Sequence, residues 1–148
     1  MEPTIRTVTK EQFDQACATH QHTYFFGNLA KPQEQFACHP GPFELGMGSY
    51  PQFTFEAPHV HAANQEFNYV LEGAVKVVNL ETGQEHMFKP GDLFSYDPGV
   101  RHLSKNLPGT RVLFFKSPGG NDKELLPLSP AIEAWGSSWD APWDGSRA

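Results

Sequence analysis

The chain has 148 residues and a formal net charge of −6, and its 11 Lys and Arg residues form no cluster. A protein with this balance lacks the basic footprint that attracts nucleic acids and anionic membranes, so we expect neither partner. The length predicts one domain, covering residues 1–148, that buries a core of its own.

The first part of the chain predicts a short helix over about residues 9–20. Thr9 can cap it while Gln12 reaches back to the cap, and Val8 and Phe13 have the spacing of a hydrophobic staple. From there to about residue 48, aromatic and turn-forming residues alternate irregularly, and only edge strands and loops are predicted.

No targeting segment is visible. The start of the chain is charged and lacks an apolar run, and no apolar stretch approaches the length that crosses a membrane. Cys17 and Cys38 are far apart and form no CxxC pair, so we expect two reduced thiols. These features predict a soluble, cytoplasmic protein.

The middle of the chain predicts a β-barrel. Turn signals such as Pro90-Gly91, Pro98-Gly99 and Pro108-Gly109 recur at regular spacing, and the runs between them are rich in β-branched and aromatic residues. Short, evenly spaced strands are typical of sandwiches and of barrels, and a barrel hides its edges. We therefore predict an all-β, single-domain jelly-roll barrel with its core at about residues 43–118.

A different pattern begins at about residue 122 and continues to residue 148. Ser129 followed by Pro130 is typical of a helix start. Trp135, Trp139 and Trp143 carry too much apolar surface to remain in water, so the tail is expected to dock on the barrel or on a second subunit.

The stretch HVHAANQE indicates a metal site. His59 and His61 are two apart, so an extended strand places both imidazoles on one face, and Glu66 begins the next strand. His102 opens a later strand that can lie opposite. Two alternatives stay open: Glu66 can pair with Lys76 on the surface, and the histidines can be hydrogen-bonded residues of a metal-free barrel.

Two motifs resemble those of the cupin superfamily. The first, G(X)5HXH(X)3,4E(X)6G, matches at His59, His61, Glu66 and Gly73, and the second, G(X)5PXG(X)2H(X)3N, matches at Gly91, Gly99, His102 and Asn106. The sequence departs from the two motifs at two places. Phe53 stands where the first motif begins with glycine, and Asp97-Pro98-Gly99 stands where the second motif has Pro-X-Gly. The resemblance implies a small jelly-roll barrel, often a homodimer, that holds one Fe, Mn, Ni, Zn or Cu ion through His59, His61, Glu66 and His102.

Five further residues are candidates for substrate contact. Phe53 and Phe55 share the parity of His59, so an unbroken strand would point both into the cavity, whereas a bulge near Pro58 would reverse this. The remaining candidates can face either the cavity or solvent: Asn68, Tyr96 and Lys116.

The other histidines are expected to be structural. His20 and His22 form a second HxH, but they follow the predicted helix, where histidine interacts favourably with the helix dipole, and no carboxylate pattern accompanies them. His39 and His86 have no partner visible in the sequence.

The sequence thus favours a metal-dependent enzyme that acts on a small polar organic molecule. A three-His site with aromatic walls would suit dioxygen chemistry, so an oxidoreductase of the dioxygenase type is the first hypothesis. Glu66 could also leave the ion and act as a catalytic base. The alternatives are an isomerase or lyase for a sugar or keto-acid, a non-catalytic ligand-binding protein, and a metal-free structural barrel.

Overall fold

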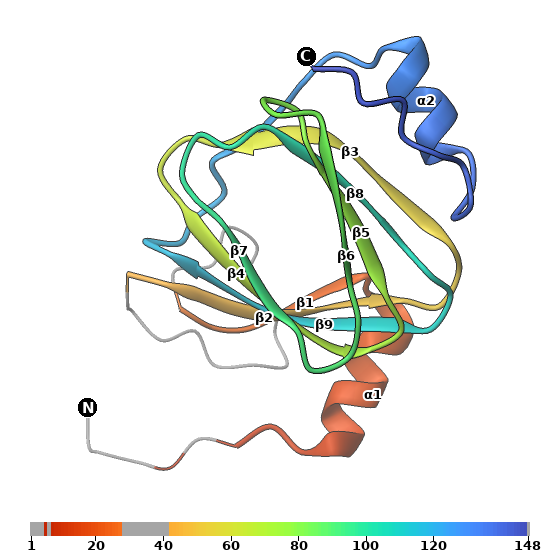
Figure 1. Ribbon diagram of the computed structural model, residues 1–148. Helices are drawn as coiled ribbons and strands as arrows, with labels where there is room; N and C mark the ends of the chain where they lie inside the picture. Colours follow the sequence, from red (N-terminus) through yellow and green to blue (C-terminus); the bar gives the residue numbers. More distant parts are fainter. Residues whose placement is uncertain (1–4, 6, 28–41, 148) are drawn as a thin grey trace.

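Two five-stranded antiparallel sheets face one another in the computed structural model, which describes residues 5, 7–27 and 42–147 (Figure 1). Sheet A has the strand order β1-β2-β9-β4-β7, and sheet B has the order β10-β3-β8-β5-β6. The strands are β1 (His22–Gly27), β2 (Glu44–Tyr50), β3 (Thr54–His61), β4 (Gln65–Glu72), β5 (Val75–Asn79), β6 (Gln84–Phe88), β7 (Leu93–Tyr96), β8 (His102–Asn106), β9 (Thr110–Ser117) and β10 (Lys123–Leu125).

The predicted all-β jelly roll is confirmed. Successive strands alternate between the two sheets over much of the chain, as when β3 lies in sheet B and β4 in sheet A. The hydrogen-bonded pairs among the described strands form two separate sheets and do not join all of these strands into one closed barrel. In the described part of the chain, no helix has both the length and the apolar character needed to cross a membrane.

Helix α1 (Lys10–Thr19) covers the part of the outer face of sheet A that β1 and β2 form. The predicted cap is present, because Gln12 N donates to Thr9 Oγ1 over 3.3 Å and Thr9 N donates to Gln12 Oε1 over 2.8 Å. Ala16 and Cys17 of the helix pack with two residues of the sheet, Phe25 and Met47.

The C-terminal tail covers the outer face of sheet B, opposite α1 (Figure 1). Helix α2 (Pro130–Gly136) begins at Ser129, whose Oγ accepts a hydrogen bond from Ile132 N over 3.3 Å. Trp135 is fully buried there and packs with Leu80 and Leu103. The tail therefore docks on its own barrel.

Lys105 anchors this tail. The residue is fully buried, and its ammonium donates to three tail carbonyls, those of Trp135, Ser138 and Ala141, over 2.9, 2.8 and 2.9 Å. The ammonium also lies 4.2 Å from the centre of the Trp135 ring. Burying a charge is costly unless its hydrogen bonds are made, and here each of the three N–H groups has an acceptor.

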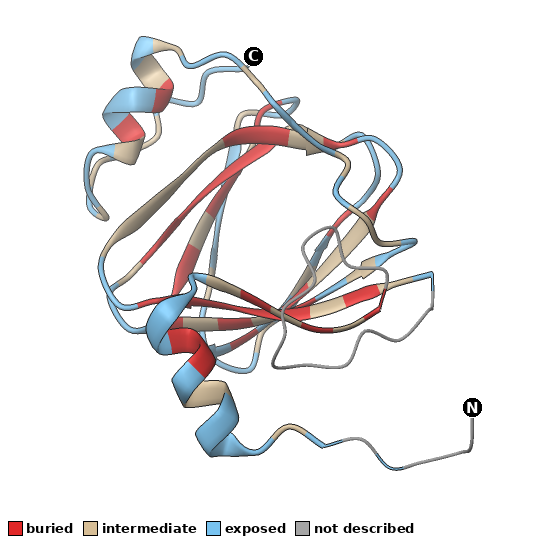
Figure 2. Cartoon of the chain, turned by 180° about the vertical axis from the view of Figure 1, so that it is seen from behind, coloured by how far each residue is buried: buried red, intermediate tan, exposed pale blue. Residues whose placement is uncertain are grey.

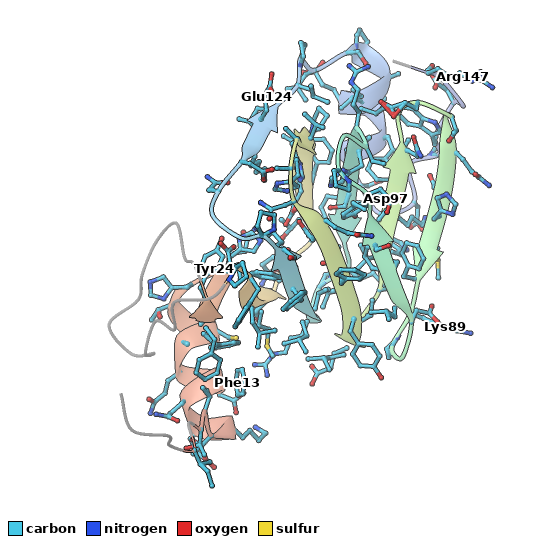
Figure 3. The ribbon with its side chains drawn as sticks, turned by 90° about the vertical axis from the view of Figure 1, so that its left-hand side faces the viewer. Phe13, Tyr24, Lys89, Asp97, Glu124 and Arg147 are labelled. Carbon is cyan, nitrogen blue, oxygen red and sulfur yellow. The ribbon has the colours of Figure 1, made fainter. Side chains whose placement is uncertain are left out.

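The space between the sheets is apolar at one end and polar at the other. Figure 2 shows buried stretches along the strands of both sheets. Val70, Val75 and Val112 are buried and form one cluster between the sheets. Figure 3 shows the side chains that project from the strands into this space. Polar residues, among them Glu66 of the same strand as Val70, line the cavity beyond the cluster.

Candidate metal centre and cavity

A cavity of about 250 Å³ lies between the two sheets, and all four predicted ligands line it. His59 and His61 end β3, and His59 is paired in register with His102 at the start of β8. The three histidines are only 4%, 4% and 2% exposed. The alternation of β3 places the two histidines on one face, as the HxH spacing predicts.

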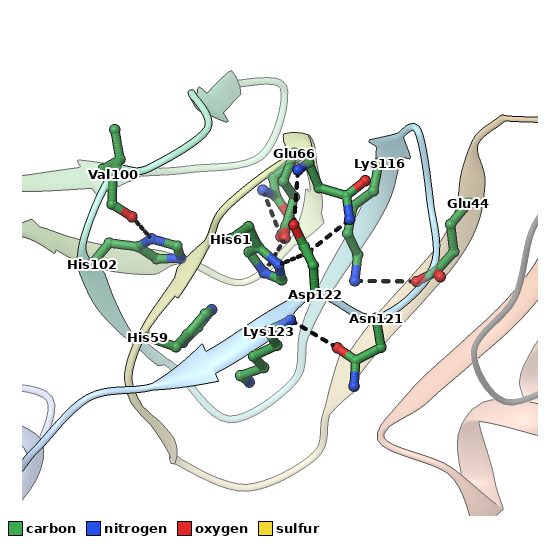
Figure 4. A network of polar contacts seen from close by, with 12 residues as sticks. Glu44, His59, His61, Glu66, Val100, His102, Lys116, Asn121, Asp122 and Lys123 are labelled. Atoms are coloured by element: carbon green, nitrogen blue, oxygen red, sulfur yellow. Dashed lines mark hydrogen bonds and ion pairs between the residues drawn. The ribbon is translucent and has the colours of Figure 1, made fainter.

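The three rings lie in contact range of one another. The His59 ring centre is 4.3 Å from that of His102 and 5.3 Å from that of His61, and the His61 and His102 centres are 6.4 Å apart. Figure 4 shows Glu66 beside His61, and Glu66 comes from β4 in the opposite sheet. Glu66 Oε2 lies 3.3 Å from His61 Nε2. Two ligands at right angles on one ion, each about 2.1 Å from it, would be separated by roughly 3 Å.

Each histidine is held through its Nδ1 atom. Nδ1 of His59 contacts the carbonyl oxygen of Ala57 over 2.8 Å, and Nδ1 of His102 contacts that of Val100 over 3.1 Å. Since a carbonyl oxygen only accepts, Nδ1 must carry the proton in both rings, and Nε2 of the neutral ring keeps a free lone pair. Metal-binding histidines are commonly oriented in this way.

His61 is oriented by a carboxylate that the sequence analysis missed. Asp122 Oδ1 lies 2.7 Å from His61 Nδ1, and Asp122 Oδ2 accepts hydrogen bonds from Ala63 N and Asn64 N over 2.8 and 2.9 Å. Asn64 Nδ2 also donates to Asp122 Oδ1 over 2.8 Å. Burial raises the pKa of Asp122, but these hydrogen bonds outweigh burial and hold it well below its ordinary value. No sequence spacing links Asp122 to the motif, because it arrives from the loop before β10.

The electrostatics suit a cation. Burial and the neighbouring His102 lower the pKa of His59 to about 4, and burial also lowers the pKa of His102. Burial raises the pKa of Glu66, but the hydrogen bond with His61 and the charge of Lys116 outweigh it and lower that pKa to about 2. Two imidazoles are therefore neutral and the carboxylate is ionised near neutral pH, as metal binding requires.

His61 behaves differently from the other two rings. Burial alone would lower its pKa, but hydrogen bonds with Glu66 and Asp122 outweigh burial and raise it. Within the described residues, no three His, Cys, Asp or Glu side chains stand together as a preformed metal site. His59, His61, Glu66 and His102 therefore line one cavity without forming a complete ligand shell.

Comparison with known proteins identifies the barrel. The family model described as the cupin domain matches residues 49–115. The chain carries a cupin domain. No curated protein matches the sequence significantly.

Solved structures with the same fold include three informative cupin neighbours. KdgF from a Halomonas species is 25% identical, with a TM-score of 0.51 over 57% of this chain and 76% of that one. An RmlC-like cupin from Shewanella frigidimarina is 21% identical, with a TM-score of 0.50 over 57% of this chain and 73% of that one. Oxalate decarboxylase from Bacillus subtilis, a protein with Mn(II) centres, is 19% identical, with a TM-score of 0.51 over 58% of this chain and 24% of that one. At such identities the last two neighbours show the fold alone.

The expectation that Phe53 and Phe55 face the cupin cavity is wrong. The register of β3 against β8 shifts between Glu56 and His59, which is the bulge that reverses the parity argument. Phe55 therefore faces outward, where its ring centre lies 6.4 Å from that of Trp135, and Phe53 is absent from the cavity lining. Glu56 takes the inward place on this strand.

The other three substrate candidates line the cavity: Asn68, Tyr96 and Lys116. Asn68 Nδ2 donates to Glu66 Oε1 over 3.2 Å, and Tyr96 stacks on His102 with 3.6 Å between ring centres. Glu66 faces inward, and the alternative partner Lys76 instead donates to the carbonyl of Trp139 over 3.0 Å.

A second polar group in the cupin cavity was also missed. Tyr50 donates to Glu56 Oε1 over 2.6 Å, and His22 Nε2 lies 3.3 Å from the same oxygen. The sequence analysis assigned His22 a structural role beside His20, but β1 begins at His22 and turns its side chain into the cavity. His86 lies on β6 and lines a second pocket together with Tyr96 and His102, and His39 lies outside the described residues.

Proposed function

We propose that this cupin is a metal-dependent enzyme that acts on a small polar organic molecule, with one divalent transition metal held by His59, His61, His102 and Glu66. The observation that carries the proposal is the anchoring of three buried imidazoles through Nδ1, at Ala57, Asp122 and Val100. Such anchoring leaves the three Nε2 atoms available in the cavity that the ionised Glu66 also lines, and this is a donor set for Fe, Mn, Ni, Zn or Cu.

When bound, the ion would polarise a substrate oxygen as a Lewis acid and, if redox-active, could activate dioxygen. The chain's own residues would place the substrate and handle protons. Burial and the nearby Glu66 raise the pKa of Tyr96 well above its ordinary value, so its hydroxyl stays protonated at neutral pH. Glu66 is the candidate base, because it is ionised and lies in the cavity.

The proposed metal site is compatible with two reaction classes. An oxidoreductase of the dioxygenase type is the first hypothesis from the ligand set. The structure adds weight to the alternative, an isomerase or lyase for a sugar or keto-acid, because Glu56 takes the place expected for an aromatic residue. Tyr50, Glu56 and His22 then supply proton-carrying groups, which suit proton transfer. A non-catalytic ligand-binding protein is the remaining candidate.

Elemental analysis followed by turnover assays tests the proposal. Protein purified without an affinity tag or added metal should contain about one transition-metal ion per chain, and His61→Ala should lose it. His20→Ala is the matched control, because His20 is exposed next to the end of α1 and is absent from the cavity lining. Reconstituted protein is then incubated with diketones, keto-acids and sugars under oxygen monitoring.

The outcomes separate the candidates. Oxygen uptake that disappears in His61→Ala identifies a dioxygenase, and conversion without uptake identifies an isomerase or lyase. Binding without conversion supports the non-catalytic alternative, and protein free of metal overturns the proposal.

We also propose that the protein is a cytoplasmic homodimer, as the cupin resemblance implies. The outer face of sheet A carries exposed apolar side chains, including Tyr69 at 40% and Leu93 at 66% exposure, which are paired in register. Light scattering at several concentrations measures the assembly, and a monomer throughout would contradict the dimer.

A further inference from the structure

One buried carboxylate oxygen in the cavity has no hydrogen-bond partner among the described residues. Glu44 is 1% exposed, and its Oε2 atom makes no hydrogen bond within the described part of the chain. Leaving a charged acceptor buried and unsatisfied is costly, and native proteins rarely retain such a group without a use. Because Glu44 lines the cavity, a bound molecule can supply the missing donor.

Lys116 is the neighbour of this oxygen. Its Nζ lies 3.1 Å from the other carboxylate oxygen of Glu44, as Figure 4 shows, and the Lys116 side chain is only 11% exposed. An ammonium carries three donors. Glu44 is the one side-chain acceptor found for it among the described residues, and Lys116 also lines the cavity.

Sheet register places this pair beside the metal-site carboxylate. Glu44 is paired with Lys116, and Lys116 is paired in turn with Glu66. Neighbouring strands lie about 4.8 Å apart, so the backbones of Glu44 and Glu66 are separated by roughly 10 Å. The cavity spans this row, and a small molecule beside Glu66 can reach the pair.

We infer that Glu44 and Lys116 recognise a hydroxyl group on the ligand, and that the ligand is a small hydroxylated acid or polyol. A hydroxyl satisfies both residues with a single atom, because its O–H donates to Glu44 Oε2 while the same oxygen accepts from Lys116 Nζ. An ether or carbonyl would leave Glu44 unsatisfied, and a carboxylate would be repelled by it. This inference rests on the proposed function in one respect, which is that the other end of the ligand lies beside Glu66 at the proposed metal site.

Matched probes test the recognition. Straight-chain ω-hydroxy acids, from 3-hydroxypropanoate to 6-hydroxyhexanoate, are compared with the alkanoates of the same length by saturation-transfer NMR and calorimetry. At the length that reaches the pair, the hydroxy acid should bind about tenfold more tightly, the effect of one hydrogen bond to charged groups. Each pair is measured on Mn-loaded and on metal-free protein.

Two variants locate the effect. Glu44→Gln keeps the size of the side chain but replaces one carboxylate oxygen by a donor, so the preference for the hydroxy acid should disappear. Glu81→Gln is the control, because Glu81 is exposed in a turn outside the cavity. The double variant E44Q/K116M should melt no lower than wild type, because it removes an unsatisfied buried charge together with its partner.

Three results would overturn the inference: equal binding of hydroxy acids and alkanoates at every length, no binding of the hydroxy acids at all, or a preference that survives in Glu44→Gln. A large fall in the melting temperature of the double variant would show that the pair holds the fold instead. The ratio between paired probes should be the same with and without metal, so failure of this inference is distinguishable from failure of the metal proposal.

Discussion

Asp122 and His61 are in hydrogen-bond contact at 2.7 Å although 61 residues separate them in the chain. This contact joins the end of β3 to the loop before β10, and it fixes the orientation of a ring whose other nitrogen faces Glu66. The orientation of His61 therefore depends on a residue outside both cupin motifs.

Asp122→Asn should weaken metal binding by roughly 10- to 100-fold, the usual cost of losing the partner of a metal-binding histidine. Asp122→Asn leaves a single side-chain oxygen. This oxygen cannot accept hydrogen bonds both from His61 and from the backbone amides of Ala63 and Asn64, as the two carboxylate oxygens of Asp122 do. Competition with a chelator measures the affinity. Asp140→Asn, an exposed change in the tail, is the control, and equal affinities for the two variants would contradict the role of Asp122.

Acid should destabilise the metal-free protein. The folded-state pKa values of His59, about 4, and Glu66, about 2, lie below the ordinary values of 6.5 and 4.5. A group with a lowered pKa contributes stability above its unfolded value and loses it as the pH falls through the folded value. We therefore expect the free energy of unfolding to fall from about pH 6.5 downward, by at most about 1.4 kcal/mol per pH unit for each group.

His61 has a raised pKa, so its contribution is complete below pH 6.5 and does not oppose this trend. Urea unfolding at a series of pH values provides the measurement. Glu56→Gln should make the fall in the free energy of unfolding less steep below pH 4.5, because the folded-state pKa of Glu56 is also lowered. Burial raises this pKa, but the hydrogen bonds with His22 and Tyr50 outweigh burial. The control is Glu81→Gln, and a flat profile in wild type would refute the prediction.

Removing the Trp135 side chain should destabilise the protein by about 3–5 kcal/mol, the range for a fully buried aromatic residue. Trp135 is 0% exposed, and its ring also covers the Lys105 ammonium. Trp139→Ala, at a partly exposed position in the same tail, should cost clearly less. Chemical denaturation of both variants tests the order, and equal losses would contradict the docking described above.

Phe55→Ala and Glu56→Gln should have separate effects. Phe55 packs outward on the tail, so its truncation should lower stability by about 2 kcal/mol and leave ligand binding unchanged. Glu56 faces the cavity, so Glu56→Gln should alter binding or turnover more than stability at pH 7. Paired unfolding and ligand-binding measurements on the two variants test this division of roles, and a loss of ligand binding in Phe55→Ala would contradict it.

The sequence was informative where local rules decide the structure. Thr9 and Gln12 predict the cap of α1, and the two-residue spacing of His59 and His61 predicts a shared face. Asp122 and Glu44 could not be found this way, because their roles depend on which strands become neighbours in the sheets. Phe55 was misplaced because a single extra residue in β3 exchanges inner and outer faces.

The anchoring of the tail bears on where the protein can be divided. The cupin match ends at residue 115, but the Lys105 ammonium donates to the carbonyls of Trp135, Ser138 and Ala141. A fragment trimmed to the matched segment would uncover Leu80 and Leu103, leave that ammonium without its carbonyls, and remove the edge strands β1 and β10. Expression clones of this protein should therefore extend well past the motif boundaries at both ends.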